Sequence, residues 1–132
     1  MSFVYTVAQL KDLSVLVDLQ SRLFLEEASI AKALDINEAL YKKYVTLMLP
    51  LSIRRTMTYI ALDQTYGKIT GLKVDLPQAL SDEELPAFPN EISQFIAQTS
   101  AVFKKLERPL EQYAAWRKGK SARTMFIGVD KP

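Results

Sequence analysis

Two runs rich in β-branched and aromatic residues flank a short polar segment near the middle of the chain, and this pattern predicts a β-hairpin. The runs span residues 57–62 and 69–74, and such residues favour strands. The segment between them contains Gly67, which can supply the positive φ that a hairpin loop needs. A chain with this pattern is expected to contain antiparallel β-structure.

Two amphipathic helices are predicted before the hairpin. Thr6 and Gln9 have the spacing of a capping box, and apolar residues then recur at helical period over the following turns. Asp35 and Glu38 repeat the capping spacing ahead of a second periodic segment. Pro50 is expected to end that second helix, because proline lacks the N–H that continues a helix.

After the hairpin, the sequence predicts a loop, a helix and a last strand. The loop spans residues 77–89, which contain three prolines and an acidic run. Residues 90–106 have helical periodicity and begin with Asn, a good capping residue. One more helical piece is expected over residues 110–116, then a basic turn at 117–121 and a strand over 122–129.

Composition excludes several classes of function. The 132-residue chain has no cysteine and no histidine, which excludes a disulfide framework, a thiol nucleophile, imidazole catalysis and Cys/His zinc sites. Its net charge of +2 comes from 17 basic and 15 acidic residues, too balanced for a nucleic-acid-binding surface. With no apolar run of about 18 residues and no signal-peptide pattern, we expect a cytoplasmic protein without a membrane or nucleic-acid partner.

The order of predicted elements is strand (residues 3–6), helix, helix, hairpin, helix and strand. This order indicates an α+β fold with a mostly antiparallel sheet flanked by helices. A single domain, residues 1–132, is expected at this length, and 48% apolar against 24% charged residues can fill its core.

Several segments resemble those of a known family. Residues 59–63 and 67–72, YIALD and GKITGL, resemble the second and third strands of the GNAT superfamily of acetyl-CoA-dependent N-acetyltransferases, where an iAld…gkivG hairpin follows two helices. Residues 126–132, FIGVDKP, resemble its fourth strand. Residues 23–34, LFLEEASIAKAL, resemble the F-x-D-E-P-L-x-x-x-L segment of insect-type arylalkylamine N-acetyltransferases, except that Ala28 replaces the proline.

The resemblance implies a GNAT-like fold that is incomplete at its C-terminus, since the family's pyrophosphate loop and later strands would follow Pro132. It implies acetyl-CoA as co-substrate, with its pantetheine arm paired to the backbone of Ile127, Gly128 and Val129. Amine acetylation needs a base, and Glu27 matches the glutamate to which the family assigns that role. The implied activity is acetyl transfer to a primary amine, with an arylalkylamine or a polyamine as acceptor and no metal.

Other interpretations of these residues stay open. Glu26 and Glu27 can form the solvated end of the first helix, paired with Arg22 or Lys32 as ordinary surface charges. Residues 127–129 can form an ordinary buried strand, in which Gly128 marks a bulge or a close approach of another backbone.

Aromatic side chains can line a pocket for an aromatic amine, or they can belong to the core, as aromatic residues at helical spacing commonly do. The aromatic residues concerned are Phe24, Tyr41, Tyr44, Tyr59, Tyr66 and Trp116.

Three functions are consistent with the sequence. The first is the N-terminal half of an N-acetyltransferase, completed by further residues or by a second polypeptide. The second is a non-catalytic, GNAT-derived binding or dimerisation module that uses an open strand at residues 122–130 to pair with a second copy or a partner. The third is a small-molecule sensor or an unrelated α+β domain.

Overall fold

The computed structural model describes residues 2–77, 85–107 and 122–130. The chain divides into two compact units, Met1–Leu76 with Thr124–Pro132 and Pro77–Arg123. Each unit is described by itself.

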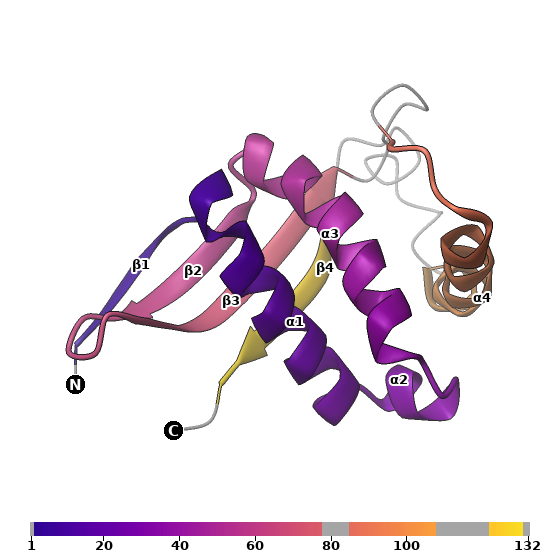
Figure 1. Ribbon diagram of the computed structural model, residues 1–132, viewed down its shortest axis with the longest axis horizontal. Helices are drawn as coiled ribbons and strands as arrows, with labels where there is room; N and C mark the ends of the chain where they lie inside the picture. Colours follow the sequence, from indigo (N-terminus) through magenta and orange to yellow (C-terminus); the bar gives the residue numbers. More distant parts are fainter. Residues whose placement is uncertain (1, 78–84, 108–121, 131–132) are drawn as a thin grey trace. The chain divides into compact units, whose positions relative to one another are not determined.

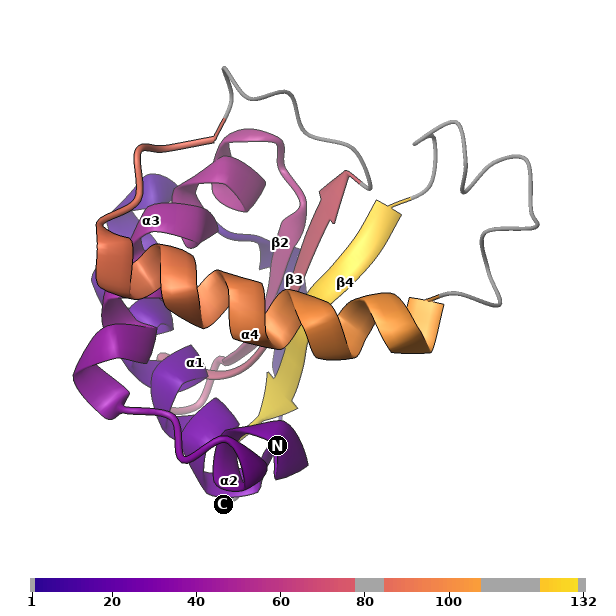
Figure 2. The ribbon, with the colours of Figure 1, turned by 90° about the vertical axis from the view of Figure 1, so that its right-hand side faces the viewer.

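The larger unit is built on a four-stranded sheet with the strand order β1-β2-β3-β4 (Figure 1). The strands are β1 (Phe3–Val7), β2 (Thr58–Asp63), β3 (Lys68–Pro77) and β4 (Ala122–Val129). Each strand runs antiparallel to its neighbours (Figure 2). The predicted hairpin and last strand are therefore confirmed, and β4 is the outer strand beside β3.

The hairpin turn forms for the reason expected from its sequence. Gly67 has a φ of +62°, a left-handed conformation that glycine adopts without steric strain. The Asp63 carboxylate accepts a hydrogen bond of 2.9 Å from the Thr65 N–H, as in a typical Asx turn. A bulge follows in β3, because Ala61 pairs with Gly71 whereas Leu62 pairs with Ile69.

Helices cover one face of this sheet (Figures 1 and 2). They are a short 3-10 helix η1 (Leu10–Asp12), α1 (Leu13–Glu27), α2 (Ser29–Ala33) and α3 (Glu38–Arg54). The core contains buried apolar side chains from α1, α3, β2 and β3: Leu16, Leu19, Leu23, Val45, Leu49, Ile60, Leu72 and Val74. The predicted α+β class with a mostly antiparallel sheet is confirmed.

The first helical segment starts later than its predicted capping box. Thr6 lies in β1 opposite Ile60, so its side chain is part of the sheet and the predicted Thr6–Gln9 box was wrong. The box is formed by Gln9 and Asp12 instead, with the Gln9 N–H donating to the Asp12 carboxylate at 2.9 Å. Strand pairing outweighs the local capping preference here.

The start of α3 is also displaced from its prediction. Asn37 is the N-cap, and its side chain accepts a hydrogen bond of 3.0 Å from the Leu40 N–H. Asp35 adopts a φ of +49° in the preceding turn, and Glu38 is the first helical residue. The capping role predicted for Asp35 was therefore wrong, since an asparagine two residues later satisfies the helix start.

Pro50 lies inside α3 and does not end it. A proline in a helix removes one backbone hydrogen bond and costs about 3 kcal/mol or more. Leu49 and Ile53, which flank it, are both buried, and burying a side chain of this size contributes about 1.5–3 kcal/mol. Packing of this last turn outweighs the local effect of proline, so the predicted helix end at Pro50 was wrong.

The smaller unit contains α4 (Asn90–Glu107). Asn90, predicted to cap this helix, is its first helical residue, and the Ile92 and Ser93 N–H groups both donate to the Pro89 carbonyl at 3.0 Å. The predicted helical piece at 110–116 and basic turn at 117–121 lie outside the described residues. Within the described ranges, no helix combines the length and the apolar composition needed to cross a bilayer.

Candidate functional site

β4 contains the three residues expected to bind the cofactor, Ile127, Gly128 and Val129, which alternate between the two faces of the sheet. Ile127 and Val129 are each 67% exposed. Leu72 packs in the core, so the preceding residue, Gly71, faces the side of the sheet away from the helices. A Cβ on Gly71 would lie 3.7 Å from Cγ2 of Val129, so Val129 faces that same side. A Cβ on Gly128 would instead meet Leu23 of α1 at 3.0 Å. The side chains of Ile127 and Val129 are therefore not buried among the described residues, whereas the close approach of another backbone at Gly128 is present, at Gly71.

The backbone N–H and C=O groups of successive β4 residues point alternately toward β3 and toward the outer edge of the sheet. The Asp130 N–H donates to the Thr70 carbonyl at 2.6 Å, and the Gly128 carbonyl lies 3.3 Å from the position of a Cβ on Gly71. Residues 128 and 130 therefore face β3. Because successive strand residues direct their N–H and C=O groups to opposite edges, Ile127 and Val129 direct theirs outward. No described strand lies beyond this edge.

Glu27, the predicted base, is the last residue of α1 and is exposed. The helix is capped there by Ala28, whose N–H donates to the Phe24 carbonyl at 2.9 Å and whose backbone is extended, with φ −76°. This φ lies within the range of proline, but proline would lack the N–H that Ala28 donates to Phe24.

A groove of about 780 Å³ runs along the outer side of α1. Its walls come from α1, the start of α3, the hairpin and the residue after β4. The apolar lining is Val15, Leu19, Leu25 and Ile69, beside Gly67, and the charged lining is Asp18, Arg22, Glu26, Glu38, Lys42, Lys68 and Asp130. Of the two glutamates that end α1, Glu26 lines this groove.

The strongest polar contact in the groove joins α1 to the end of β4. Arg22 donates two hydrogen bonds to Asp130, Nη1 to Oδ1 at 3.1 Å and Nη2 to Oδ2 at 2.9 Å. Lys68 at the hairpin adds its ammonium at 3.6 Å from Oδ2. The Asp130 side chain is 13% exposed and that of Arg22 is 45% exposed, so the carboxylate is largely removed from solvent.

This geometry shifts the pKa values of both partners. Hydrogen bonding from Arg22 lowers the pKa of the Asp130 carboxyl below its ordinary value of 3.8, against an opposing effect of desolvation. The bond to Asp130 likewise raises the pKa of Arg22. The pair is therefore fully ionised at neutral pH.

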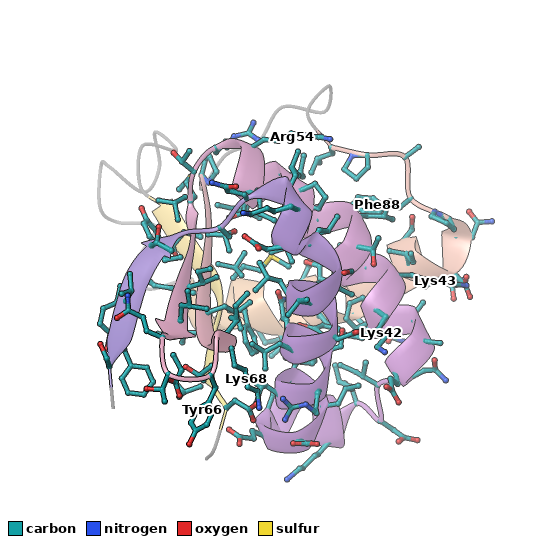
Figure 3. All side chains as sticks on the ribbon, turned by 60° about the vertical axis from the view of Figure 1, so that its left-hand side comes forward. Lys42, Lys43, Arg54, Tyr66, Lys68 and Phe88 are labelled. Carbon is teal, nitrogen blue, oxygen red and sulfur yellow. The ribbon has the colours of Figure 1, made fainter. Side chains whose placement is uncertain are left out.

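A second charged cluster lies at the other wall of the groove. Lys42 on α3 is 3.3 Å from Asp18 of α1 and 3.8 Å from Glu38, one turn earlier on its own helix. Figure 3 labels Lys42 on α3 and Lys68 on the hairpin, with Tyr66 at the hairpin tip pointing outward. Exposed pairs of this kind contribute at most about 1 kcal/mol.

The aromatic residues divide between core and surface. Tyr41 is buried, and its ring stacks on Phe24 at 4.2 Å between centroids. Gln20 donates a hydrogen bond of 3.2 Å to the Tyr41 hydroxyl, and burial raises the pKa of this phenol. Tyr44 is half-buried, and Tyr59 and Tyr66 are exposed. Trp116 lies outside the described residues.

Sequence reasoning missed the pairing of Arg22 with Asp130. It placed Arg22 beside the acidic end of α1, whereas the guanidinium bonds a carboxylate 108 residues away. It also missed that Glu26 is the groove-lining glutamate. That position was predictable, because residues 15, 18, 19, 22, 25 and 26 follow the spacing of one helix face.

Solved structures provide the comparison for this arrangement. One match is the C-terminal condensation domain of Ebony, solved in complex with beta-alanyl-dopamine, with a TM-score of 0.68, 12% sequence identity and coverage of 86% of this chain and 52% of that chain. Another is mosquito arylalkylamine N-acetyltransferase like 5b, with a TM-score of 0.58, 19% identity and coverage of 98% of this chain and 61% of that chain. No protein-family model and no curated protein matches the sequence.

These likenesses establish the fold. The chain spans a little more than half the length of both solved chains. Its strand order, the helices on one face and the hairpin after them correspond to the elements that the resemblance implied. The chain has a GNAT-like fold through its fourth strand, similar to that of an arylalkylamine N-acetyltransferase-like protein.

Proposed function

We propose that this chain is the N-terminal half of an acetyl-CoA-dependent N-acetyltransferase that acts on a primary amine. The observation that carries the proposal is the outer edge of β4 in a GNAT-like sheet, beside which no further strand lies among the described residues. That edge presents the backbone groups of Ile127 and Val129, two of the three residues that the family resemblance assigns to cofactor binding.

The free edge suits the pantetheine arm of acetyl-CoA. The arm contains two amide groups, and amides add to an exposed strand edge through main-chain hydrogen bonds. Ile127 and Val129 supply these bonds in the proposal, whereas Gly128 faces β3 and contributes by lacking a side chain beside Leu23.

The proposed chemistry is direct transfer. The neutral amine attacks the thioester carbonyl, the C–N bond forms, the C–S bond breaks, and the thiolate of CoA leaves. The amine must first lose a proton from its ammonium form, and a positioned carboxylate can accept it directly or through water. Glu27, exposed at the end of α1, is the proposed base.

The groove along α1 is the proposed acceptor site. An amine with a hydrocarbon body can place that body against Leu19, Leu25 and Ile69 and its ammonium against Glu26, all of which line the groove. This combination suits an arylalkylamine or a polyamine, and these are the first two acceptor classes to screen.

Calorimetric titration of acetyl-CoA into the chain, with CoA as a second ligand, tests the proposal. Saturable binding with unit stoichiometry is expected. Val129→Pro removes the outward N–H and should abolish binding, while Val129→Ala keeps the N–H and should bind within about twofold of the parent, because strand addition depends on main-chain bonds. Absence of heat with both ligands would contradict the proposal.

The adjacent glutamates provide a matched test of the catalytic roles. Glu27→Gln should lower kcat for amine acetylation by about a hundredfold or more, the usual contribution of general base catalysis. Glu26→Gln should raise KM for the amine and leave kcat near its parent value. Equal behaviour of the two variants would contradict the division of roles between them.

A second candidate is a module that dimerises through residues 122–130 without catalysis. The exposed side chains of Ile127 and Val129 on an outer strand favour it, since folded proteins usually cover such edges. Sedimentation equilibrium distinguishes the two functions. A dimer that dissociates in the Val129→Pro variant and does not bind acetyl-CoA supports the module. A monomer that binds acetyl-CoA supports the enzyme.

A further inference from the structure

We infer that Arg22 and Asp130 are positioning residues that hold the helix carrying the proposed base in register with the strand that presents the cofactor edge. This inference rests on the proposed function. It assigns a role to two residues that line the proposed acceptor groove but take no part in the proposed chemical step.

The location of the pair along the chain supports this role. Asp130 directly follows Val129, the last outward-facing residue of β4. Arg22 lies on α1 ahead of Glu27, about 7.5 Å along the helix axis at 1.5 Å per residue. A single charge pair therefore joins the two segments that contain all the predicted site residues.

The geometry of the pair makes it more restrictive than a typical surface contact. Both Asp130 carboxylate oxygens accept hydrogen bonds from Arg22, at 3.1 and 2.9 Å. Two parallel bonds of this kind fix orientation as well as distance. The pair is partly open to solvent, with side-chain exposures of 13% for Asp130 and 45% for Arg22, so its two-bond geometry rather than its energy carries the positioning role.

The backbone at Asp130 is held at the same time. Asp130 lies one residue beyond the end of β4, and its N–H donates to the Thr70 carbonyl at 2.6 Å. Lys68, at the start of β3, approaches the same carboxylate at 3.6 Å. The end of β4 is thus tied to β3 through its backbone and to α1 through its side chain, which sets the position of the Val129 backbone.

Another ion pair in the chain provides a matched control. Lys73 and Asp75 lie 3.3 Å apart with side-chain exposures of 46% and 13%, against 45% and 13% for Arg22 and Asp130. Both Lys73 and Asp75 belong to β3, so this pair connects no two elements. Asp75→Asn therefore removes a pair of equal exposure that has no positioning role.

The test compares Arg22→Met, Arg22→Lys, Asp130→Asn and Asp75→Asn by acetyl-CoA titration, with the thermal midpoint of each variant measured in parallel. Arg22→Met and Asp130→Asn should weaken acetyl-CoA binding by about tenfold, because the outward backbone groups of β4 would no longer be held in place before the ligand binds. Arg22→Lys keeps the charge without the planar fork and should fall between Arg22→Met and the parent. Asp75→Asn should bind as the parent does.

Hydrogen exchange of the residue-130 amide provides a readout that needs no ligand. Asp130→Asn and Arg22→Met should speed this exchange, and Asp75→Asn should leave it unchanged. Unchanged exchange and affinity in Arg22→Met would overturn the inference alone. Failure of the parent chain to bind acetyl-CoA would overturn the proposed function, whatever the exchange shows.

Discussion

Gly128 is expected to accept no side chain without rearrangement of the residues packed against it. A Cβ at this position would lie 2.8 Å from both Cε1 and Cζ of Phe126 and 3.0 Å from Cδ1 of Leu23. Carbon atoms at optimal contact are about 3.5–4.0 Å apart. Gly128→Ala therefore forces the Phe126 ring to rotate or moves β4 away from α1.

The expected magnitude follows from two opposing effects. Extra atoms forced into a packed contact typically cost about 1–3 kcal/mol. Alanine also restricts the unfolded chain more than glycine does, which offsets about 0.4–1 kcal/mol. We expect Gly128→Ala to lower the free energy of unfolding by about 1–2 kcal/mol, with about 3–5 °C in Tm for each kcal/mol at this chain length.

Urea denaturation of single and double variants checks the steric cause. Phe126→Leu removes the two ring atoms that a new Cβ would meet, so Gly128→Ala should cost less in that background. Gly67→Ala is the control, because Gly67 has a φ of +62° and nothing within 4 Å of a Cβ. It should cost about 1–2 kcal/mol from its left-handed backbone alone, in either background. If Gly128→Ala lowers the free energy of unfolding equally in the parent and in the Phe126→Leu background, the contact with the Phe126 ring is not the cause.

Three further results are expected. Leu49→Ala should lower the free energy of unfolding in urea by about 2–5 kcal/mol, because Leu49 is fully buried; a loss below about 1 kcal/mol would contradict that burial. Arg22 lowers the pKa of the Asp130 carboxyl in the folded chain, so on acidification this carboxyl is protonated in the unfolded chain before it is protonated in the folded one. The stability from Asp130 is therefore present above pH 3.8 and is lost as the pH falls through its native pKa. Asp130→Asn should therefore flatten the acid side of a Tm-against-pH curve, and an identical acid side would count against the pairing. Burial raises the pKa of Tyr41 above 10.0, so stability should decline as the pH rises beyond 10.0; Tyr41→Phe should reduce that decline in alkaline denaturation, and an equal slope would show that this phenol ionises normally.

The elements that the sequence predicted correctly are those whose signal is local and repeated. The hairpin combines two β-branched runs with a glycine that adopts the positive φ it was expected to supply, and the last strand has the predicted bounds, Ala122–Val129. The helix ends were less predictable, because they depend on competition between local and tertiary interactions. Thr6 pairs with β2 as part of β1. Burial of Leu49 and Ile53 keeps α3 helical beyond Pro50.

The candidate site likewise combines features that local motifs predict with features that depend on tertiary structure. The motif resemblance proposed Glu27 and the segment 127–129 as site residues. Within that segment, alternation along the strand directs the backbone groups of Ile127 and Val129 to the outer edge, and this depends on which neighbour β4 pairs with. The contact between Arg22 and Asp130 depends on how α1 lies over the sheet. No local pattern in the sequence encodes it, since 108 residues separate the two partners.

The most direct test of the account follows the backbone amides of β4 by NMR while acetyl-CoA is added to the chain. Shifted resonances and slowed exchange are expected for the outward amides of Ile127 and Val129. The amide of Gly128, which already faces β3, should change less. Saturating acetyl-CoA with no change at residues 127 and 129 would contradict the proposal that this strand edge holds the cofactor.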